Sequence, residues 1–325
     1  MLIKLVKKSN KNHIVGKTAA SGDESHGAIR PFIDKITLLL HLSDYEEADE
    51  IHKSIWVQLA EKPLFQSAGS KAAKGYKRSC FLALETTHHR VLFQYDWDGP
   101  PGQAVATKLR LEFNPRKLGP LALSELAAIL ESMLPNGWGD VVHHARITRI
   151  DVAADLPNVR MDDLHLIPKK GASEMQWWRD GKLQTFRHGK PNGNQTIVYS
   201  VKQKRLAKGQ PHSGLSVVRI ERRLRSPAVG TIAKLGALEN PFAGIAIVSL
   251  IPNPPPNQTG SNAANQWSMF EDSVKLRGVR AALALIPEDR RAKYRAHLKS
   301  FPKPWWKPEA IWSHWPEAYE VLVNP

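Results

Sequence analysis

Cysteine is almost absent from the 325-residue sequence, in which Cys80 stands alone. One thiol excludes an intramolecular disulfide and a cysteine-based zinc site, and it is typical of a reducing compartment. Long apolar runs are also missing, since the longest, Phe242 to Ile251, is about half of what a bilayer crossing needs. The first residues carry no apolar stretch long enough for a signal peptide. These absences predict a soluble, cytoplasmic protein with no membrane partner.

Acidic residues are few relative to basic ones. Forty-six Lys and Arg face 31 Asp and Glu, which gives a net charge of +15 and an isoelectric point of about 9.8. Eight basic residues and one acid lie between Lys202 and Arg225, so this short stretch carries +7 of the excess. Such an excess indicates attraction to a polyanion through counterion release. A basic face that is merely solvated is the alternative.

Composition divides the chain into four parts. Residues 1–30 are polar and aperiodic, which predicts a mobile basic tail, and residues 31–227 form the expected main domain. Residues 228–260, with Pro252-Asn-Pro-Pro-Pro-Asn, are an expected linker region, and residues 261–325 are an expected smaller helical, tryptophan-rich region. In the main domain, β-prone runs mostly follow one another, with helices in the gaps. This order predicts an α+β fold, mainly an antiparallel sheet with flanking helices.

Apolar periodicity and turn residues also predict the individual elements. The expected strands cover residues 32–42, 78–85, 90–95, 109–113, 145–156, 175–187, 195–201 and 215–225. The expected helices cover residues 43–62, 121–134, 161–166 and 263–285. Four tryptophans follow: Trp305, Trp306, Trp312 and Trp315. They are expected to dock the C-terminus on the core, and stacking on single-stranded bases is the alternative.

An acidic motif lies in the strand expected over 145–156. Alternate residues of a strand share a face, so Arg149, Asp151 and Asp155 line one side of it. Two carboxylates about 13 Å apart along a strand cannot both bind one metal ion without a bend. Asp151, at the centre of the strand, is therefore the favoured ligand. An exposed sheet face with an Arg–Asp pair is the alternative.

Tyr199 is the one tyrosine of six at which an apolar strand leads directly into a basic cluster, formed by Lys202, Lys204 and Arg205. A free tyrosine has a pKa of about 10. It needs nearby positive charge or a metal ion before it can attack a phosphate. The position of Tyr199 therefore predicts a nucleophile, with an interfacial tyrosine in a sheet as the alternative.

A second acid stands among arginines in the strand expected over 215–225. Arg219, Glu221, Arg223 and Arg225 share one face of that strand. Glu221 is then either a structural ion-pair partner or a metal-binding acid inside a phosphate-binding strip.

In combination, these segments resemble the Rep_trans family, the replication initiation factors of rolling-circle plasmids, filamentous phages and some integrative elements. The resemblance rests on Asp151-Val-Ala-Ala-Asp, on Tyr199-Ser-Val-Lys about 45 residues later, and on Arg219-Ile-Glu-Arg-Arg some 20 residues after that. Three further segments resemble the family's early strands and the hairpin ahead of its tyrosine: Phe32-Ile-Asp-Lys-Ile-Thr, Leu109-Arg-Leu-Glu-Phe-Asn-Pro and Phe186-Arg-His-Gly. The match spans roughly residues 30–230.

The resemblance implies a nickase- or relaxase-like fold and a metal-dependent DNA nicking-joining endonuclease. Tyr199 would attack one DNA strand and remain linked to the 5′ phosphate, leaving a free 3′ hydroxyl. Asp151, Glu221 and Asp155 would be the acids of a Mg²⁺ or Mn²⁺ site. Lys202 would neutralise the leaving oxygen or lower the pKa of Tyr199. Because a strand puts Lys202 and Tyr199 on opposite faces, this role requires the chain to turn helical after Tyr199.

The implied partners are double-stranded origin DNA, a single-stranded nick site, and a host helicase and polymerase, with a homodimer as one possible assembly. A host helicase is implied because no Gly-x-x-x-x-Gly-Lys-Ser/Thr motif for ATP hydrolysis occurs. The lack of a His-x-His motif favours a carboxylate metal site within the nickase class. The expected DNA contacts are Arg149, Lys204, Arg205, Lys208, Arg219, Arg223 and Arg225. The alternatives are a non-catalytic origin-binding initiator and an RNA-binding or unrelated basic protein; a phage-encoded chain would act in the host cytoplasm.

Overall fold

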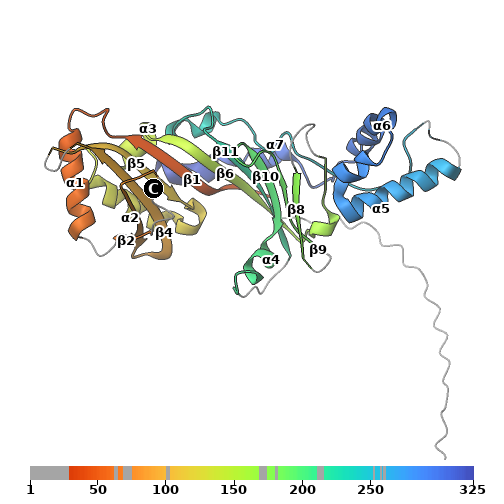
Figure 1. The fold of residues 1–325 in the computed structure, drawn as a ribbon, viewed down its shortest axis with the longest axis horizontal. Helices are drawn as coiled ribbons and strands as arrows, with labels where there is room; N and C mark the ends of the chain where they lie inside the picture. Colours follow the sequence, from red (N-terminus) through yellow and green to blue (C-terminus); the bar gives the residue numbers. More distant parts are fainter. Residues whose placement is uncertain are drawn as a thin grey trace, which may run out of the picture.

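A computed structural model describes residues 29–61, 65–68, 75–99, 103–167, 174–179, 182–210, 216–251, 253–256, 258 and 261–325. Nearly all of the tail expected over 1–30 lies outside these residues. The described chain forms an elongated α+β molecule built on one ten-stranded antiparallel sheet with flanking helices (Figure 1). The predicted fold class is confirmed.

The large sheet has the strand order β2-β3-β4-β5-β1-β6-β11-β10-β9-β8. Its strands are β1 (Pro31–His41), β2 (Phe65–Ser67), β3 (Arg78–Leu84), β4 (Thr87–Asp98), β5 (Val105–Phe113), β6 (Arg146–Pro157), β8 (Glu174–Arg179), β9 (Lys182–His188), β10 (Gln195–Ser200) and β11 (Val217–Arg225). A second, two-stranded sheet pairs β7 (His165–Ile167) with β12 (Ala246–Val248). The strand run expected over 175–187 is thus a hairpin of two strands, β8 and β9.

The helices flank the sheet and form most of the C-terminal part. They are α1 (Ala48–Glu61), α2 (Pro115–Glu131), α3 (Trp138–His143), α4 (Val201–Leu206), α5 (Ser261–Ala284), α6 (Glu288–Lys299), α7 (Pro308–Trp312) and α8 (Trp315–Val323), with 3-10 helices η1 (Met161–Asp163) and η2 (Ile232–Ala237).

Several helix boundaries differ from the sequence-based expectations. The first helix begins at Ala48 rather than at Ser43, because the residues between them form turns. α2 begins at Pro115, earlier than expected, where the side chain of Asn114 accepts a hydrogen bond from the backbone N–H of Lys117 at 3.0 Å. The helix expected over 161–166 is a single 3-10 turn that leads into β7.

One face of the sheet is apolar and holds the main core. α2, α3 and α8 all contact β1 on this face. Strand side chains that point towards them, such as Ile150, Val152 and Ile220, are fully buried. Burial of these alternating residues stabilises the fold and leaves the other side chains of the same strands on the opposite, polar face.

A β-bulge in β1 changes which residues reach each face. The pairing of β1 with β6 shifts register between Ile33 and Lys35. As a result, Ile33 and Ile36 are both buried in the core although they are three residues apart. Asp34 and Lys35 both lie on the polar face, where they contact Arg219 and Glu112.

The segment expected as a linker, residues 228–260, contributes to the main core through Ile232, Leu235 and Phe242. The tryptophans of the last 25 residues dock onto this part. The indole N–H of Trp306 donates to the carbonyl of Ile245 at 2.9 Å, and that of Trp315 donates to Leu235 at 2.8 Å. Docking of the C-terminus through these side chains is therefore confirmed.

α5 and α6 lie at the far end of the molecule from α1 (Figure 1). They share a separate apolar cluster centred on Trp267, which is fully buried against Phe270 and Tyr294. None of the helices in the described part of the chain combines the length and the apolar character that a membrane crossing requires.

Candidate active site

Strands β6, β11 and β10 bring the three motifs together on the polar face of the sheet. Tyr199 of β10 is paired in register with Arg219 of β11, and Arg219 is paired with Asp155 of β6. Farther along the same strands, Gln195, Arg223 and Asp151 form a parallel row. Glu221 lies on the same face between the two rows. Residues more than 40 positions apart in the sequence thus become neighbours because three strands pair antiparallel.

Arg219 is the centre of the first row. Its guanidinium donates to Asp155 at 2.6 and 3.1 Å and to Asp34, on β1, at 2.7 Å. Asp155 also accepts from Arg116 at 2.7 Å, and both arginines lie over the ring of Phe32. Two carboxylates and two guanidinium groups therefore balance one another, so Asp155 is an ion-pair partner in this arrangement.

Asp151 of the second row and the neighbouring Glu221 form a charge cluster with two arginines, Arg149 and Arg223. Asp151 is 1% exposed and accepts from Arg149 at 2.8 Å. Arg223 connects the two acids, because its Nε lies 3.4 Å from Asp151 and its Nη2 donates to Glu221 at 3.1 Å. The carbonyl oxygen of the Gln195 side chain accepts from Arg223 at 3.2 Å. A single guanidinium thus lies between the two buried carboxylates.

Glu221 carries an incompletely compensated charge. It is 4% exposed. Burial raises the pKa of its carboxyl group to about 6, with further contributions from the charges of Asp151 and Asp34, although Arg223 and Lys204 oppose the shift. The arrangement therefore favours an additional cation or proton near Glu221.

Tyr199 is enclosed between cations at the end of β10. Only 4% of its surface is exposed, and this burial raises the pKa of the phenol above its ordinary value. The charge of Arg219 acts in the opposite direction and favours the phenolate. The tyrosine is protonated at neutral pH in this state, so any nucleophilic role depends on cations near its oxygen.

The chain turns helical directly after Tyr199, as a role for Lys202 required. The hydroxyl of Ser200 caps α4 by accepting from the backbone N–H of Gln203 at 3.3 Å. The turn brings Lys204 over the aromatic ring, with its Nζ 3.8 Å from the ring centroid, while Lys202 is exposed. Burial of the ammonium group lowers the pKa of Lys204. The residue as a whole is nevertheless exposed. Lys204 rather than Lys202 is the lysine in contact with Tyr199.

The predicted metal ligands come together only in part. In the described residues, no three or more His, Cys, Asp or Glu side chains converge on one point that could hold a metal ion. Asp155 is engaged by Arg116 and Arg219. Asp151 and Glu221 offer the carboxylate oxygens that Mg²⁺ and Mn²⁺ prefer, and the raised pKa of Glu221 indicates that a cation between them would be favourable. Their donor chemistry fits such an ion, which would take the place of the Arg223 guanidinium.

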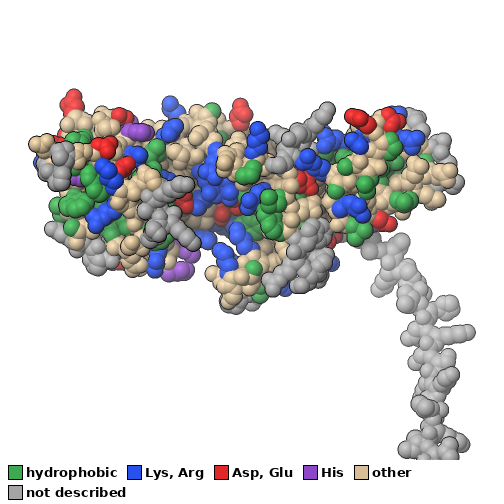
Figure 2. All heavy atoms as spheres, viewed as in Figure 1, with side chains coloured by type: hydrophobic (Ala, Val, Ile, Leu, Met, Phe, Trp, Pro, Cys, Tyr) green, Lys and Arg blue, Asp and Glu red, His purple; other side chains and the backbone are tan. Residues whose placement is uncertain are grey.

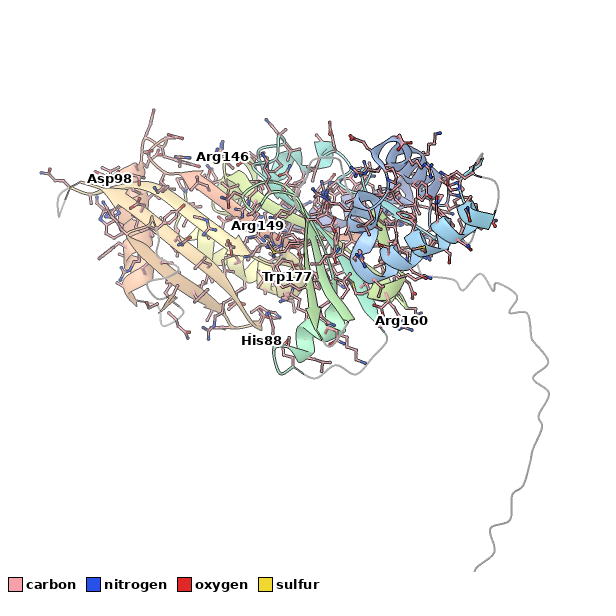
Figure 3. All side chains as sticks on the ribbon, turned by 45° about the vertical axis from the view of Figure 1, so that its right-hand side comes forward. His88, Asp98, Arg146, Arg149, Arg160 and Trp177 are labelled. Atoms are coloured by element: carbon pink, nitrogen blue, oxygen red, sulfur yellow. The ribbon has the colours of Figure 1, made fainter. Side chains whose placement is uncertain are left out.

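Apart from Lys204, which contacts Tyr199, the cations predicted to contact DNA fall into two groups. Arg149, Arg219 and Arg223 are held in the ion pairs above, whereas Arg205, Lys208 and Arg225 are exposed and pair with no carboxylate in the described part of the chain. Lysine and arginine side chains gather over the middle of this face and around α4 (Figure 2). In Figure 3, Arg149 lies near the centre, between Arg146 and Trp177 of β8. The exposed group is therefore available to a polyanion.

A hollow of about 530 Å³ adjoins the first row of charges. Phe32, Arg116 and Asp155 line it, together with the exposed Arg30. Both arginines of this lining are paired with acids, Arg30 with Glu317 and Arg116 with Asp155, so the charges around the hollow are largely balanced.

Sequence reasoning missed Asp34 and Arg116 as members of the site. Strict alternation along β1 places Asp34 on the core side with Ile36, and only the bulge moves it to the polar face. Arg116 lies in the first turn of α2, and its contact with Asp155 joins segments 39 positions apart. The segment Phe32-Ile-Asp-Lys, on which the family resemblance partly rests, was the one available signal for Asp34.

Comparisons of the whole chain with models of protein families and with curated proteins found no match in either case.

Proposed function

We propose that this protein is a DNA-nicking replication initiator that cuts one strand of its own replicon through Tyr199. One observation carries the proposal: Tyr199, Arg219 and Asp155 form a row across three adjacent strands, with Lys204 over the tyrosine ring. Although burial raises the pKa of Tyr199, Arg219 favours its phenolate, and Lys204 lies over its ring as a second cation.

In the proposed reaction, the Tyr199 hydroxyl gives its proton to water, its oxygen forms a bond to phosphorus, and the bond from phosphorus to the 3′ oxygen breaks. The product is a 5′-phosphotyrosine link and a free 3′ hydroxyl. Arg219 stabilises the phenolate and the charge on the phosphate. Lys204 is suited to protonate the leaving 3′ oxygen, because its lowered pKa makes its ammonium a better acid than an ordinary lysine.

The proposal includes Mg²⁺ or Mn²⁺ between Asp151 and Glu221. When bound, such an ion would polarise the phosphate and stabilise its developing charge. In its absence Arg223 supplies the positive charge between the two acids. Asp155 is assigned to positioning Arg219 rather than to the metal ion.

Binding to origin DNA would use the exposed cations of this surface. Arg205 and Lys208 follow Tyr199 on and just after α4, and Arg225 ends β11. Contacts to phosphate carry affinity and salt dependence but little sequence information. A host helicase and polymerase would then extend the 3′ hydroxyl.

A second candidate function, an origin-binding initiator that does not cut DNA, is favoured by the burial of Tyr199. A side chain that is 4% exposed has to be uncovered before it can meet a phosphodiester. The same basic surface would serve this function without any chemical role for Tyr199.

The two functions are distinguished by incubation of the full-length protein with supercoiled DNA of its own replicon and Mg²⁺ or Mn²⁺. Nicking predicts open-circular DNA and a covalent adduct whose nucleotide maps to Tyr199 by mass spectrometry. Tyr199→Phe should abolish both products and leave duplex binding nearly unchanged, since the ring and its packing are kept. Tyr294→Phe, at another buried tyrosine, is the matched control and should nick normally. Binding without nicking or adduct would favour the second candidate, and an adduct on another tyrosine would overturn the assignment.

A further inference from the structure

A cavity of about 450 Å³ lies on the apolar side of the sheet, opposite the Tyr199 site. One wall comes from β9, β10 and β11, with His188, Thr196 and Arg222, and the other comes from η2 and the loops that follow it. The volume lies within the range of small-molecule binding sites.

Arg222 is a charged residue on an otherwise apolar face of β11. Val218, Ile220 and Leu224, which share its side of β11, are buried apolar residues. Its Nη1 donates to the hydroxyl of Thr196, and its Nε is buried with no hydrogen-bond partner. No carboxylate in the described part of the chain forms an ion pair with it. By contrast, Arg219 and Arg223 on the polar face each pair with two acids.

Arg222 is partly buried, and a cation that loses part of its hydration without gaining a counter-ion costs folding free energy. Burial accordingly lowers the pKa of the Arg222 guanidinium, and no neighbouring acid opposes the shift. A guanidinium in such surroundings is expected where an anion from outside the chain forms an ion pair with it. The planar guanidinium presents parallel N–H groups that match a carboxylate or phosphate.

We propose that this cavity binds a small organic anion, a singly charged carboxylate or phosphate diester with an apolar body, whose charged group pairs with Arg222. The single charge of the ligand is inferred from the residues that line the cavity. Arg222 is the one Lys or Arg among the described lining residues, and Glu239 lies at the exposed rim of the cavity. A multiply charged ligand would therefore be under-neutralised. Phe186, Leu238 and Ile245 provide the apolar surface for the body. The inference is independent of the nicking reaction, because the two sites lie on opposite faces.

Three probes of similar shape test the inference on the full-length protein: 4-phenylbutyrate, methyl phenyl phosphate, which as a diester carries one negative charge, and the neutral 4-phenylbutyramide. Binding is measured by calorimetry and by ligand-observed NMR at millimolar concentration. At least one of the two anions should bind, and the amide should bind about tenfold to a hundredfold more weakly, the usual effect of losing a charge-assisted hydrogen bond. The better of the two anions identifies the charged group. Equal binding of the amide and its carboxylate, or no binding of either anion, would overturn the proposal.

Three variants examine the walls. Arg222→Met should reduce anion binding to the level of the amide and should leave the melting temperature unchanged or raised, because a partly buried charge without a counter-ion is removed. Arg222→Lys, which keeps a cation but lacks the planar donor pair, should bind with intermediate affinity and shows that the fold tolerates substitution there. Glu239→Gln should tighten binding several-fold. Undiminished anion binding by a folded Arg222→Met protein would show that the cavity does not use this residue.

Discussion

The ammonium group of Lys204 lies 3.8 Å from the centre of the Tyr199 ring, across the first turn of α4. A cation over a tyrosine ring is attracted by the electrons of its face, more strongly when the pair is shielded from water. The contact has a second consequence: it places a lysine with a lowered pKa next to the proposed nucleophile. Burial lowers the pKa of Lys204, while the charges of Glu221 and Asp34 oppose the shift.

The first prediction concerns which lysine takes part in cleavage. Lys204→Met should lower the single-turnover cleavage rate of a single-stranded nick-site oligonucleotide by about a hundredfold, the usual contribution of a positioned proton donor. Lys202→Met is the matched control and should cleave at nearly the normal rate, since both lysines are exposed but it is Lys204 that contacts the Tyr199 ring. A larger loss of cleavage rate in the Lys202 variant would assign the role near Tyr199 to Lys202, as the family resemblance implies.

The second prediction concerns stability and pH through Glu221. Its pKa in the folded protein, about 6, lies above the ordinary value of 4.5, so the folded state binds more protons than the unfolded chain between these values. The stabilisation from this group is therefore full below pH 4.5 and is lost as the pH rises through 6. The loss amounts to about 2 kcal/mol of unfolding free energy.

Glu221→Gln should remove this pH dependence. Urea unfolding of both proteins at several pH values from acid to neutral gives the difference in unfolding free energy, which should change by about 2 kcal/mol across this window in favour of the variant at neutral pH. Glu309→Gln, at an exposed position, should show no such trend. A difference that does not vary with pH would mean that Glu221 is ionised normally.

The third prediction separates the acids proposed for the metal ion from the acid that positions Arg219. Asp151→Asn should abolish specific Mn²⁺ binding, measured by electron paramagnetic resonance of the free ion and by the thermal shift that Mn²⁺ causes. Asp155→Asn should bind Mn²⁺ normally, because Asp155 is paired with Arg116 and Arg219. Each variant removes one negative charge, so a general electrostatic effect would weaken Mn²⁺ binding equally in both. Equal losses in the two proteins would contradict the assignment.

The fourth prediction tests the DNA-binding surface. Replacement of Lys202, Arg205 and Lys208 by Gln should weaken binding to all DNA sequences and reduce the slope of log affinity against log salt by about two to three, at about 0.9 for each phosphate that the protein no longer neutralises. Lys204 is left in place because it contacts Tyr199. Cleavage of a bound single-stranded site should be largely spared.

The control for the fourth prediction is a triple substitution at the C-terminal end, of Lys293, Lys299 and Lys307 by Gln. These lysines are exposed, and their replacement removes the same total charge from another part of the molecule. An equal change of slope in both triple variants would indicate net charge alone, and an unchanged slope in the first would mean that the basic residues on and after α4 face away from DNA.

Most of the fold could be predicted from the sequence, because strands and helices differ in the period of their apolar residues. Phe32 to Leu42, Ala145 to Leu156 and Val217 to Arg225 alternate or run apolar clearly enough that their strands were expected nearly at the observed bounds. The α+β class followed from the order of these elements. Helix beginnings were less accurate, since a cap such as Asn114 depends on a single side chain.

The sequence by itself determined which residues of each strand share a face, and hence that Asp151 and Glu221 would lie on polar sides of their strands. Only the tertiary structure decided which strands are neighbours, and pairing brings Tyr199, Arg219 and Asp155 into one row. It also decided that Asp34 joins them, through a bulge that no alternating pattern reveals, and that Lys204 contacts the tyrosine. The reason is physical: local periodicity is a property of a few consecutive residues, whereas the partners of a buried charge are chosen by long-range pairing and by the need to neutralise it.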